Sequence, residues 1–459
     1  MSRNTHSPLL AYPVVVACLS AHLGSLDSAI NISFPSITAA FSLPVTAIQW
    51  VVIGYVLTHG SLLLGCGGLA DRWGHSRLLT WGLLISAVAF AGCGLATHYS
   101  WLVACRIVQG LGAALIFGSA PALVTLAVPG EQRGRALGIY QMSTAVGYAV
   151  GPLLGGMLVD GFNWRATFLF RLPPALLLAW LAATKCPAPT KPQEAQRFDF
   201  LGALTLAASV AGCLLALSRS RALGWSAPLV VTLSCGAVAC FIGFLVIEKR
   251  SPAPVIDLRL FRNIGFVIAN LLSVMANCAR FAIGLLLPYY LINVLHYPAT
   301  VGGSLMLATY VLTIAAAPLA GKWSDRIGTA LLASLGLAVE GVGLWLLGQL
   351  DAQAGYIPLA MTLVVVGLGL GIFEAPNMSF VMGSIPRNRQ GVAGSIASMM
   401  RPLGIVAGAS GWSMLFDWRR AANPAQAAGA SPFQDVFVGA AGLCAVACFL
   451  SLFRSEKKT

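Results

Sequence analysis

The sequence predicts an all-α protein that crosses a membrane many times, and three observations support this prediction. Of the 459 residues, 58% are hydrophobic and only 9% are charged, whereas about a quarter of the residues in a soluble domain are charged. The apolar residues form runs of roughly 20, the length of a membrane-spanning helix. The pattern Gly-x-x-x-Asp-Arg-x-Gly occurs twice, at 67–74 and 321–328, each time between two apolar runs. Two related halves in a membrane are a common plan of secondary transporters.

Fourteen apolar runs are predicted to span the membrane. The first begins near Pro8 and has no A-x-A type cleavage site, so we expect a retained helix rather than a signal peptide. The seventh and eighth are the weakest, because Arg219, Arg221 and Trp225 interrupt them; a count of twelve would require both to be re-entrant or peripheral. The predicted spans are 10–35, 48–70, 78–97, 101–127, 135–159, 166–184, 200–218, 228–247, 264–294, 301–321, 329–349, 356–382, 391–416 and 433–453.

The basic residues predict how these spans are oriented. With the N-terminus inside, 19 of the 28 Lys and Arg residues lie in cytoplasmic segments, 5 in outer loops and 4 within spans. Both termini are therefore expected to be cytoplasmic, with the chain in the inner (plasma) membrane. The net charge of +13 then reflects membrane topology and does not require a nucleic-acid partner.

The spacing of the repeated pattern predicts the domain organisation. Asp71 and Asp325 are 254 positions apart, whereas six helices with short loops need roughly 180–200 residues. The excess of about 60 fits one additional helix pair. A second similarity between the halves, that of Glu131-Gln-Arg-Gly134 to Asn388-Arg-Gln-Gly391, supports the repeat. We expect a six-helix bundle at 1–190, a two-helix insert with flanking linkers at 191–255 and a second six-helix bundle at 256–459.

Several motifs in order along the chain resemble those of one family. The loop Gly67–Arg77 resembles the signature loop of the major facilitator superfamily, and Arg106–Ala114 its fourth-helix motif. The segment Leu26–Pro35 resembles the fourteen-helix drug:proton antiporter branch, and Gly147–Gly156 resembles a motif of antiporters. The resemblance implies the major facilitator fold and proton-coupled efflux (antiport) of a small, amphiphilic organic solute by alternating access.

Two sets of residues are expected to act in the conformational change. Four glycines, three of them spaced four residues apart, allow another helix to approach closely, and a proline among them can bend the helix. Ordinary packing and a sealing role in the cycle are equally supported. This antiporter-type motif consists of Gly147, Gly151, Pro152, Gly155 and Gly156. The two signature loops are predicted to latch an inner gate through Gly67, Asp71, Arg72, Gly74 and Arg77 in the first and Asp325 and Arg326 in the second.

Charged residues within the spans are candidates for function, because each costs several kcal/mol unless it is paired or hydrated. Removing the insert makes spans one, four, nine and twelve the helices that the superfamily places around its central cavity. They carry Asp27, Arg106, Arg280 and Glu374, one on each. The other charged residues are Glu340 on a helix that the family places at the periphery, Arg171, expected to snorkel near the outer interface, and Arg401, with either a structural or a functional role.

Asp27 and Arg106 are expected at comparable depth, so they can pair if their helices are neighbours. A buried carboxylate favours its protonated form and a nearby arginine favours its charged form. Asp27, modulated by Arg106, or else Glu374, is therefore predicted to carry the coupling proton. Asn31 lies four residues after Asp27, on the same face if the segment is α-helical.

The substrate is the least determined property. Candidate cavity residues are Asn31, Tyr55, Tyr140, Arg280, Tyr289 and Asn377. Three acids and four arginines lie within the spans, so a cationic solute is not favoured and an amphiphilic or anionic one stays possible. No phosphate-binding loop, nucleophile–base set or metal-binding pattern occurs. We expect no enzyme activity, no cofactor or metal besides the proton gradient, and a protein that works as a monomer in the lipid bilayer. The alternatives are a proton-coupled importer or facilitator of a metabolite or organic anion and a non-transporting membrane sensor.

Overall fold

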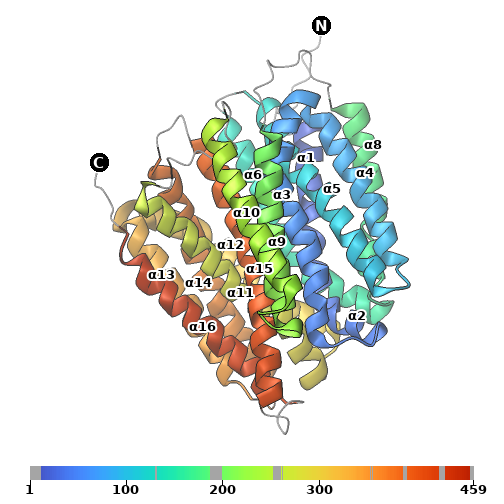
Figure 1. Ribbon diagram of the computed structural model, residues 1–459, viewed down its shortest axis with the longest axis vertical. Helices are drawn as coiled ribbons and strands as arrows, with labels where there is room; N and C mark the ends of the chain where they lie inside the picture. The colour runs from blue at the N-terminus through green and yellow to red at the C-terminus, as the bar shows by residue number, and fades with distance from the viewer. Residues whose placement is uncertain are drawn as a thin grey trace.

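The computed structural model describes residues 12–129, 132–186, 199–251, 260, 262–351, 353, 355–385, 390–422 and 429–454. These residues form helices joined by short connections, without a β-strand (Figure 1). In chain order the helices of the first part are α1 (Tyr12–Ser25), η2 (Leu26–Ser33), α2 (Phe34–Ala40), η3 (Val45–Ile48), α3 (Gln49–Trp73), α4 (His75–Gly94), α5 (Tyr99–Leu126), α6 (Arg133–Gly161), α7 (Ala166–Leu169) and α8 (Leu172–Lys185). They continue with α9 (Phe200–Leu223), α10 (Pro228–Arg250), α11 (Ile264–Tyr289), η6 (Tyr290–Val294), α12 (Ala299–Ile327), α13 (Thr329–Gln349), α14 (Tyr356–Gly383), α15 (Gln390–Ala422) and α16 (Ser431–Ser451).

Two glycines of the repeated pattern turn the chain at equivalent places in the two halves. Gly74 separates α3 from α4 with a φ of 94°, and Gly328 separates α12 from α13 with a φ of 100°. Only glycine adopts such angles without steric cost. Each turn reverses the chain within one residue, so the two helices that it joins begin and end at the same side of the bundle.

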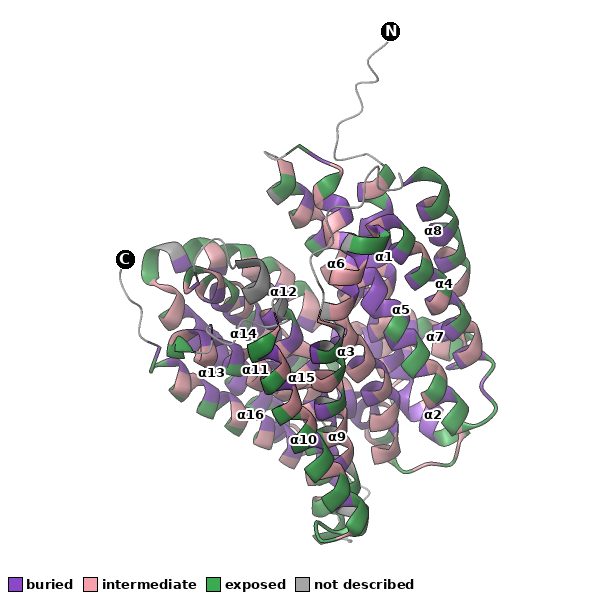
Figure 2. Ribbon diagram, turned by 45° about the horizontal axis from the view of Figure 1, so that its top comes forward, coloured by how far each residue is buried: buried purple, intermediate pink, exposed green. Residues whose placement is uncertain are grey.

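The helices form two bundles, α1–α8 and α11–α16 (Figure 1). In the first bundle α5 packs on α3 and α4, and α1 packs on α6. In the second, α14 packs on α12 and α13, and α11 packs on α15 and α16. The helices α9 and α10 pack on each other, and α9 also contacts α3 and α15, so this pair covers the junction of the bundles (Figure 2). The bundles themselves meet through α6 with α12 and α3 with α15.

Eleven of the fourteen predicted spans each fall on a single long helix, whereas the spans 10–35, 166–184 and 264–294 each cover more than one helix. Among the described residues, twelve helical segments are long and apolar enough to cross a membrane. The helices α9 and α15, of 24 and 33 residues, are not among these twelve. The domain boundaries expected near residues 190 and 255 lie outside the described residues.

Candidate functional site

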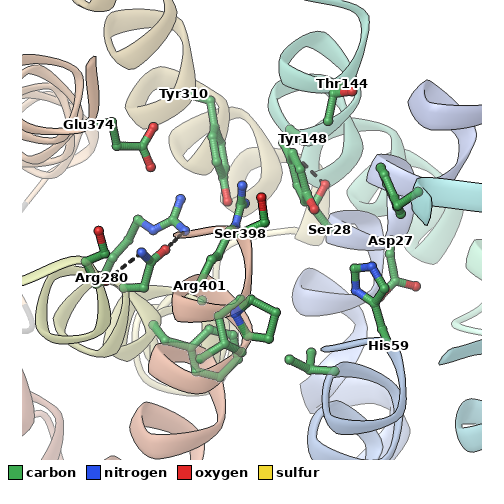
Figure 3. Close-up of a pocket in the computed structure, with 18 of the residues that line it drawn as sticks. Asp27, Ser28, His59, Thr144, Tyr148, Arg280, Tyr310, Glu374, Ser398 and Arg401 are labelled. Atoms are coloured by element: carbon green, nitrogen blue, oxygen red, sulfur yellow. Dashed lines mark hydrogen bonds between the residues drawn. The ribbon is translucent and has the colours of Figure 1, made fainter. Parts of the chain in front are cut away.

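A cavity of about 730 Å³ lies between the two bundles. Its walls come from η2, α3, α5 and α6 of the first bundle and from α11, α12, α14 and α15 of the second. Figure 3 shows Asp27 and His59 on one side, Arg280 and Glu374 on the other, and Arg401 with Tyr148 and Tyr310 between them. The size is that of a site for a drug-sized molecule.

Asp27 lies at the centre of a hydrogen-bonded cluster in the first bundle. Its Oδ1 accepts hydrogen bonds from Arg106 Nη1 at 2.7 Å, Gln109 Nε2 at 2.7 Å and Arg171 Nη1 at 3.0 Å. Its Oδ2 accepts one from Arg106 Nη2 at 2.9 Å. The predicted pairing of Asp27 with Arg106 is therefore present, in the bidentate form that makes a strong, oriented ion pair.

The two arginines of this cluster are held by further contacts. Arg106 also donates from Nε to the carbonyl oxygen of Val51, and its guanidinium lies 4.2 Å from the centre of the Tyr55 ring. Arg171 is fully buried, with its guanidinium 4.4 Å from the ring centre of Phe90. The expectation that Arg171 snorkels to the outer interface is wrong, because Asp27 offers this cation a buried counter-ion. One carboxylate between two guanidinium groups leaves the cluster with one net positive charge.

Asn31 lines the same cavity as Asp27, although the helix between them is not α-helical. Residues Leu26–Ser33 form a 3₁₀ helix, in which residues three apart lie on one face. The α-helical argument for a shared face therefore does not apply to this segment. Both side chains nevertheless border the cavity, because η2 passes directly along its wall.

In the second bundle, Arg280 and Glu374 both point into the cavity (Figure 3). Arg280 Nη2 donates to Asn277 Oδ1 at 2.7 Å, one turn earlier on α11. No ion pair joins Arg280 or Glu374 to another side chain among the described residues. Glu374 is thus a carboxylate without an ion-pair partner that borders the cavity.

Arg401 of α15 crosses the space between the bundles and lies against Tyr148 of α6. Its guanidinium is 4.2 Å from the centre of the Tyr148 ring, in a cation–π contact. Among the described residues it has no ion pair and no hydrogen bond. Arg401 is one of the residues that line the cavity.

The structure brings most of the predicted cavity and proton-coupling residues together. Those that line the cavity are Asp27, Asn31, Tyr55, Arg106, Tyr140, Arg280, Glu374 and Asn377. The amide group of Asn377 already makes hydrogen bonds within the protein. Its Nδ2 donates to Ala269 O at 3.1 Å and to Ser273 Oγ at 2.8 Å, and Arg454 donates to its Oδ1. The placement of Tyr289 in the cavity is wrong: its side chain is fully buried between the bundles and its hydroxyl donates to Phe34 O at 3.2 Å.

The sequence analysis missed a polar stripe on α6. Gln141, Thr144 and Tyr148 all line the cavity, and they follow one another at three- and four-residue spacing. This spacing places them on one face of a helix. The same periodicity is present in the sequence and could have identified them there.

The glycines of the antiporter-type motif are packing positions. A Cβ on Gly151 would lie 2.1 Å from Ser28 Oγ, and one on Gly155 would lie 2.2 Å from the carbonyl oxygen of Ala29. A Cβ on Gly156 would lie 2.3 Å from the carbonyl oxygen of Ala299, which begins α12 in the other bundle. The motif therefore packs α6 against η2 on one side and against the second bundle on the other.

The remaining predicted residues do not line the cavity. Arg72, Arg77 and Arg326 of the signature loops are exposed, and the side chains of Asp71 and Asp325 lie outside the described residues. Glu340 is fully buried on α13, and both of its carboxylate oxygens lack a hydrogen-bond partner among the described residues. The part of the chain that the structure describes holds no group of three His, Cys, Asp or Glu side chains that could bind a metal ion.

Comparison with known proteins is consistent with this architecture. A family profile described as Major Facilitator Superfamily matches residues 16–261 and 269–459. The chain is 28% identical to the riboflavin transporter RibZ of Clostridioides difficile, over 88% of this chain and 87% of the relative. It is 31% identical to the multidrug resistance protein Stp of Mycobacterium tuberculosis, over 83% of this chain and 70% of the relative. The crystal structure of a bacterial homologue of the human lysosomal transporter Spinster, inward-facing and unoccupied, has a TM-score of 0.72 at 15% identity, covering 98% of this chain and 97% of that chain.

Proposed function

The chain belongs to the major facilitator superfamily, whose members are transporters and not enzymes, and from this premise we propose that it exports a small amphiphilic organic solute in exchange for protons. The observation that carries the proposal is a cavity between the two bundles that is bordered by two ionisable carboxylates, Asp27 and Glu374. A solute and a proton can then use the same cavity in turn. A multidrug resistance protein among the relatives favours export, and so does the antiporter-type motif of α6.

The proposal includes a membrane topology. The twelve apolar segments and the helices α9 and α15 together make fourteen spans, and all of them cross the inner (plasma) membrane of the cell. Both chain termini are cytoplasmic. The contacts between the bundles at Gly156 with Ala299 and at Tyr289 with Phe34 lie at the ends of helices far from the termini. On this topology the outer end of the cavity is closed and the protein faces inward. It works as a monomer in the lipid bilayer.

The two cavity carboxylates are proposed to play different parts in proton coupling. Asp27 accepts four hydrogen bonds from charged and amide groups, which favour its ionised form. It can accept a proton only after the arginines move, so its protonation is tied to rearrangement of the first bundle. Glu374 has no ion pair to break among the described residues and can exchange a proton with water in the cavity. No cofactor takes part, because the proton gradient supplies the energy.

The decisive experiment measures proton movement driven by solutes. Purified protein is reconstituted into liposomes that enclose a pH-sensitive dye, and a mixed solute library is added under a clamped pH gradient. An antiporter moves protons opposite to at least one solute, and Asp27→Asn or Glu374→Gln should abolish this movement while solute exchange persists. If both variants still drive solute against its gradient, these carboxylates do not carry the proton. Absence of any solute-dependent proton movement would favour the membrane-sensor alternative.

A second candidate is proton-coupled uptake of an organic anion. It is favoured by the number of arginines around the cavity, because an anion and a proton bound close together reinforce each other's binding. The liposome assay distinguishes the two candidates by sign: protons and solute move in the same direction in uptake and in opposite directions in export.

A further inference from the structure

The cavity contains more positive than negative charge. Among the described residues, its walls carry the arginines Arg106, Arg280 and Arg401 and the carboxylates Asp27 and Glu374. Arg171 adds a further positive charge directly behind Asp27. Charged groups inside a membrane protein are costly unless they find counter-charges, so the excess of arginine requires an explanation.

Asp27 is not available as a receptor for a cation. Its two oxygens already accept hydrogen bonds from Arg106, Arg171 and Gln109. A cationic solute at this carboxylate would have to displace a guanidinium group, and would leave that buried group without a counter-ion. The first bundle therefore presents a filled, net positive cluster to the cavity.

The second bundle has two arginines that are not neutralised by an ion pair. In the part of the chain that the structure describes, Arg401 lies against the ring of Tyr148, Arg280 donates to the amide oxygen of Asn277, and neither is in an ion pair. Glu374 lies on the same side of the cavity as Arg280 (Figure 3). Neither arginine lies within ion-pair distance of a carboxylate among the described residues, so both guanidinium groups can contact a ligand.

Aromatic side chains surround these arginines. Tyr148 and Tyr310 lie on either side of Arg401 (Figure 3), and Phe281 lines the cavity next to Arg280 along α11. Planar aromatic groups stack on one another and on guanidinium planes. The polar groups in this part of the cavity are therefore cationic, and the apolar side chains around them are aromatic.

We propose that the cavity binds an aromatic organic anion, with its acidic group between Arg280 and Arg401 and its ring against Tyr148 and Tyr310. The inference rests on the proposal that the cavity is the transport site, and it holds for either direction of transport. A guanidinium group forms paired, charge-assisted hydrogen bonds to a carboxylate. Glu374 competes with the ligand for the same arginines.

The test compares three probes with the same ring. Wild-type protein in detergent is titrated by equilibrium dialysis with 1-naphthaleneacetate, 1-naphthaleneacetamide and 2-(1-naphthyl)ethylamine, which are anionic, neutral and cationic at neutral pH. We expect the carboxylate to bind at least about ten-fold more tightly than the other two, because two charge-assisted contacts are added. A carboxylate that binds no more tightly than the amide, or an amine that binds best, overturns the inference.

Variants locate the binding to the proposed arginines. Arg401→Gln and Arg280→Gln should each weaken binding of the carboxylate by about ten-fold and leave that of the amide within about two-fold. Arg401→Lys should retain most of the preference for the anion. The matched control is Arg420→Gln, an exposed arginine near the other end of α15, which should change neither. Size-exclusion profiles show whether each variant is folded, and unchanged carboxylate binding in both Gln variants rejects the site.

The result of the binding test can be told apart from the result of the liposome assay for the proposed function. If a neutral or cationic solute drives proton movement in liposomes, the chain is a proton-coupled transporter but the anion site is rejected. If the naphthaleneacetate site depends on Arg401 and no solute moves protons, the site is supported and the coupled transport is rejected.

Discussion

Asp160, near the end of α6, joins the two bundles by accepting hydrogen bonds from Thr300, in the first turn of α12. Its Oδ2 accepts from the backbone N–H and from the hydroxyl of Thr300, both at 2.7 Å, and its Oδ1 accepts from the N–H of Ala299 at 3.0 Å. A carboxylate at the start of a helix satisfies free N–H groups and is favoured by the helix dipole. In the proposed inward-facing arrangement, this clamp holds the cavity closed at the end opposite the termini.

Replacement of Asp160 should favour opening at that end. Asp160→Ala removes the side chain of α6 that caps the start of α12 in the other bundle, and loss of such a cap costs about 1 kcal/mol of stabilisation. This free energy changes the ratio of closed to open protein about five-fold. Spin labels on α6 and α12 near the clamp should report longer distances. The matched control is Asp435→Asn, which removes an ion pair with Arg419 within the second bundle. Equal distance distributions in Asp160→Ala and wild type would exclude the clamp.

The Asp27 cluster should behave as a single unit. Arg106→Gln removes a bidentate pair and leaves Asp27 with Arg171 and Gln109, and loss of one partner of a buried pair costs about 3–5 kcal/mol. We expect a large fall in thermal stability in detergent. Adding Asp27→Asn should cost less stability in this variant than in the wild type, because the bidentate pair with Arg106 is already lost. Strictly additive losses in the double-mutant cycle would show that the two residues are not coupled.

Gly156 should not tolerate a methyl group, although it lies in a helix where alanine is otherwise preferred. Its Cβ would approach the carbonyl oxygen of Ala299 to 2.3 Å, and backbone cannot move aside as a flexible side chain can. Gly156→Ala should therefore weaken the α6–α12 contact and lower transport. Gly138→Ala on the same helix is the control, because nothing lies within 4 Å of a Cβ there. It should be neutral or slightly stabilising, since alanine is the better helix former. Similar transport by the two variants would contradict the packing role of Gly156.

The two signature loops are predicted to differ in importance. The first loop ends in Arg77, whereas the equivalent part of the second, after Gly328, has no basic residue. If the loops latch an inner gate, Arg77 gives the first loop a basic group after its turn that the second loop lacks. Asp71→Asn should then reduce the transport rate more than Asp325→Asn, measured in liposomes at equal protein content. The opposite order would reject this difference.

Much of the fold could be predicted from the sequence because the membrane restricts the choices. A run of about 20 apolar residues has to form a helix when no water satisfies its backbone. The glycines at Gly74 and Gly328 are required by positive φ angles, so the repeated pattern marked equivalent turns correctly. The pairing of Asp27 with Arg106 followed from their comparable depth.

Other parts of the site could not be predicted in this way. Arg171 is 144 positions from Asp27, and its depth in its own helix does not reveal that it points inward. The helix of Tyr289 predicts a place in the cavity, yet its side chain is buried and its hydroxyl donates to the carbonyl oxygen of Phe34 in the other bundle. Tyr148 was missed, although it is the aromatic partner of Arg401.

The sequence by itself determined the class of protein, the helical runs, the duplication and the charged residues that have to find partners in the membrane. The tertiary structure alone decided which partner each charge has and which side chains share the cavity. The reason is that a membrane helix is apolar on most of its surface, so hydropathy sets its length and depth but not its rotation about its axis. That rotation is fixed by close packing with helices distant in the sequence, such as η2 and α12 against the glycines of α6.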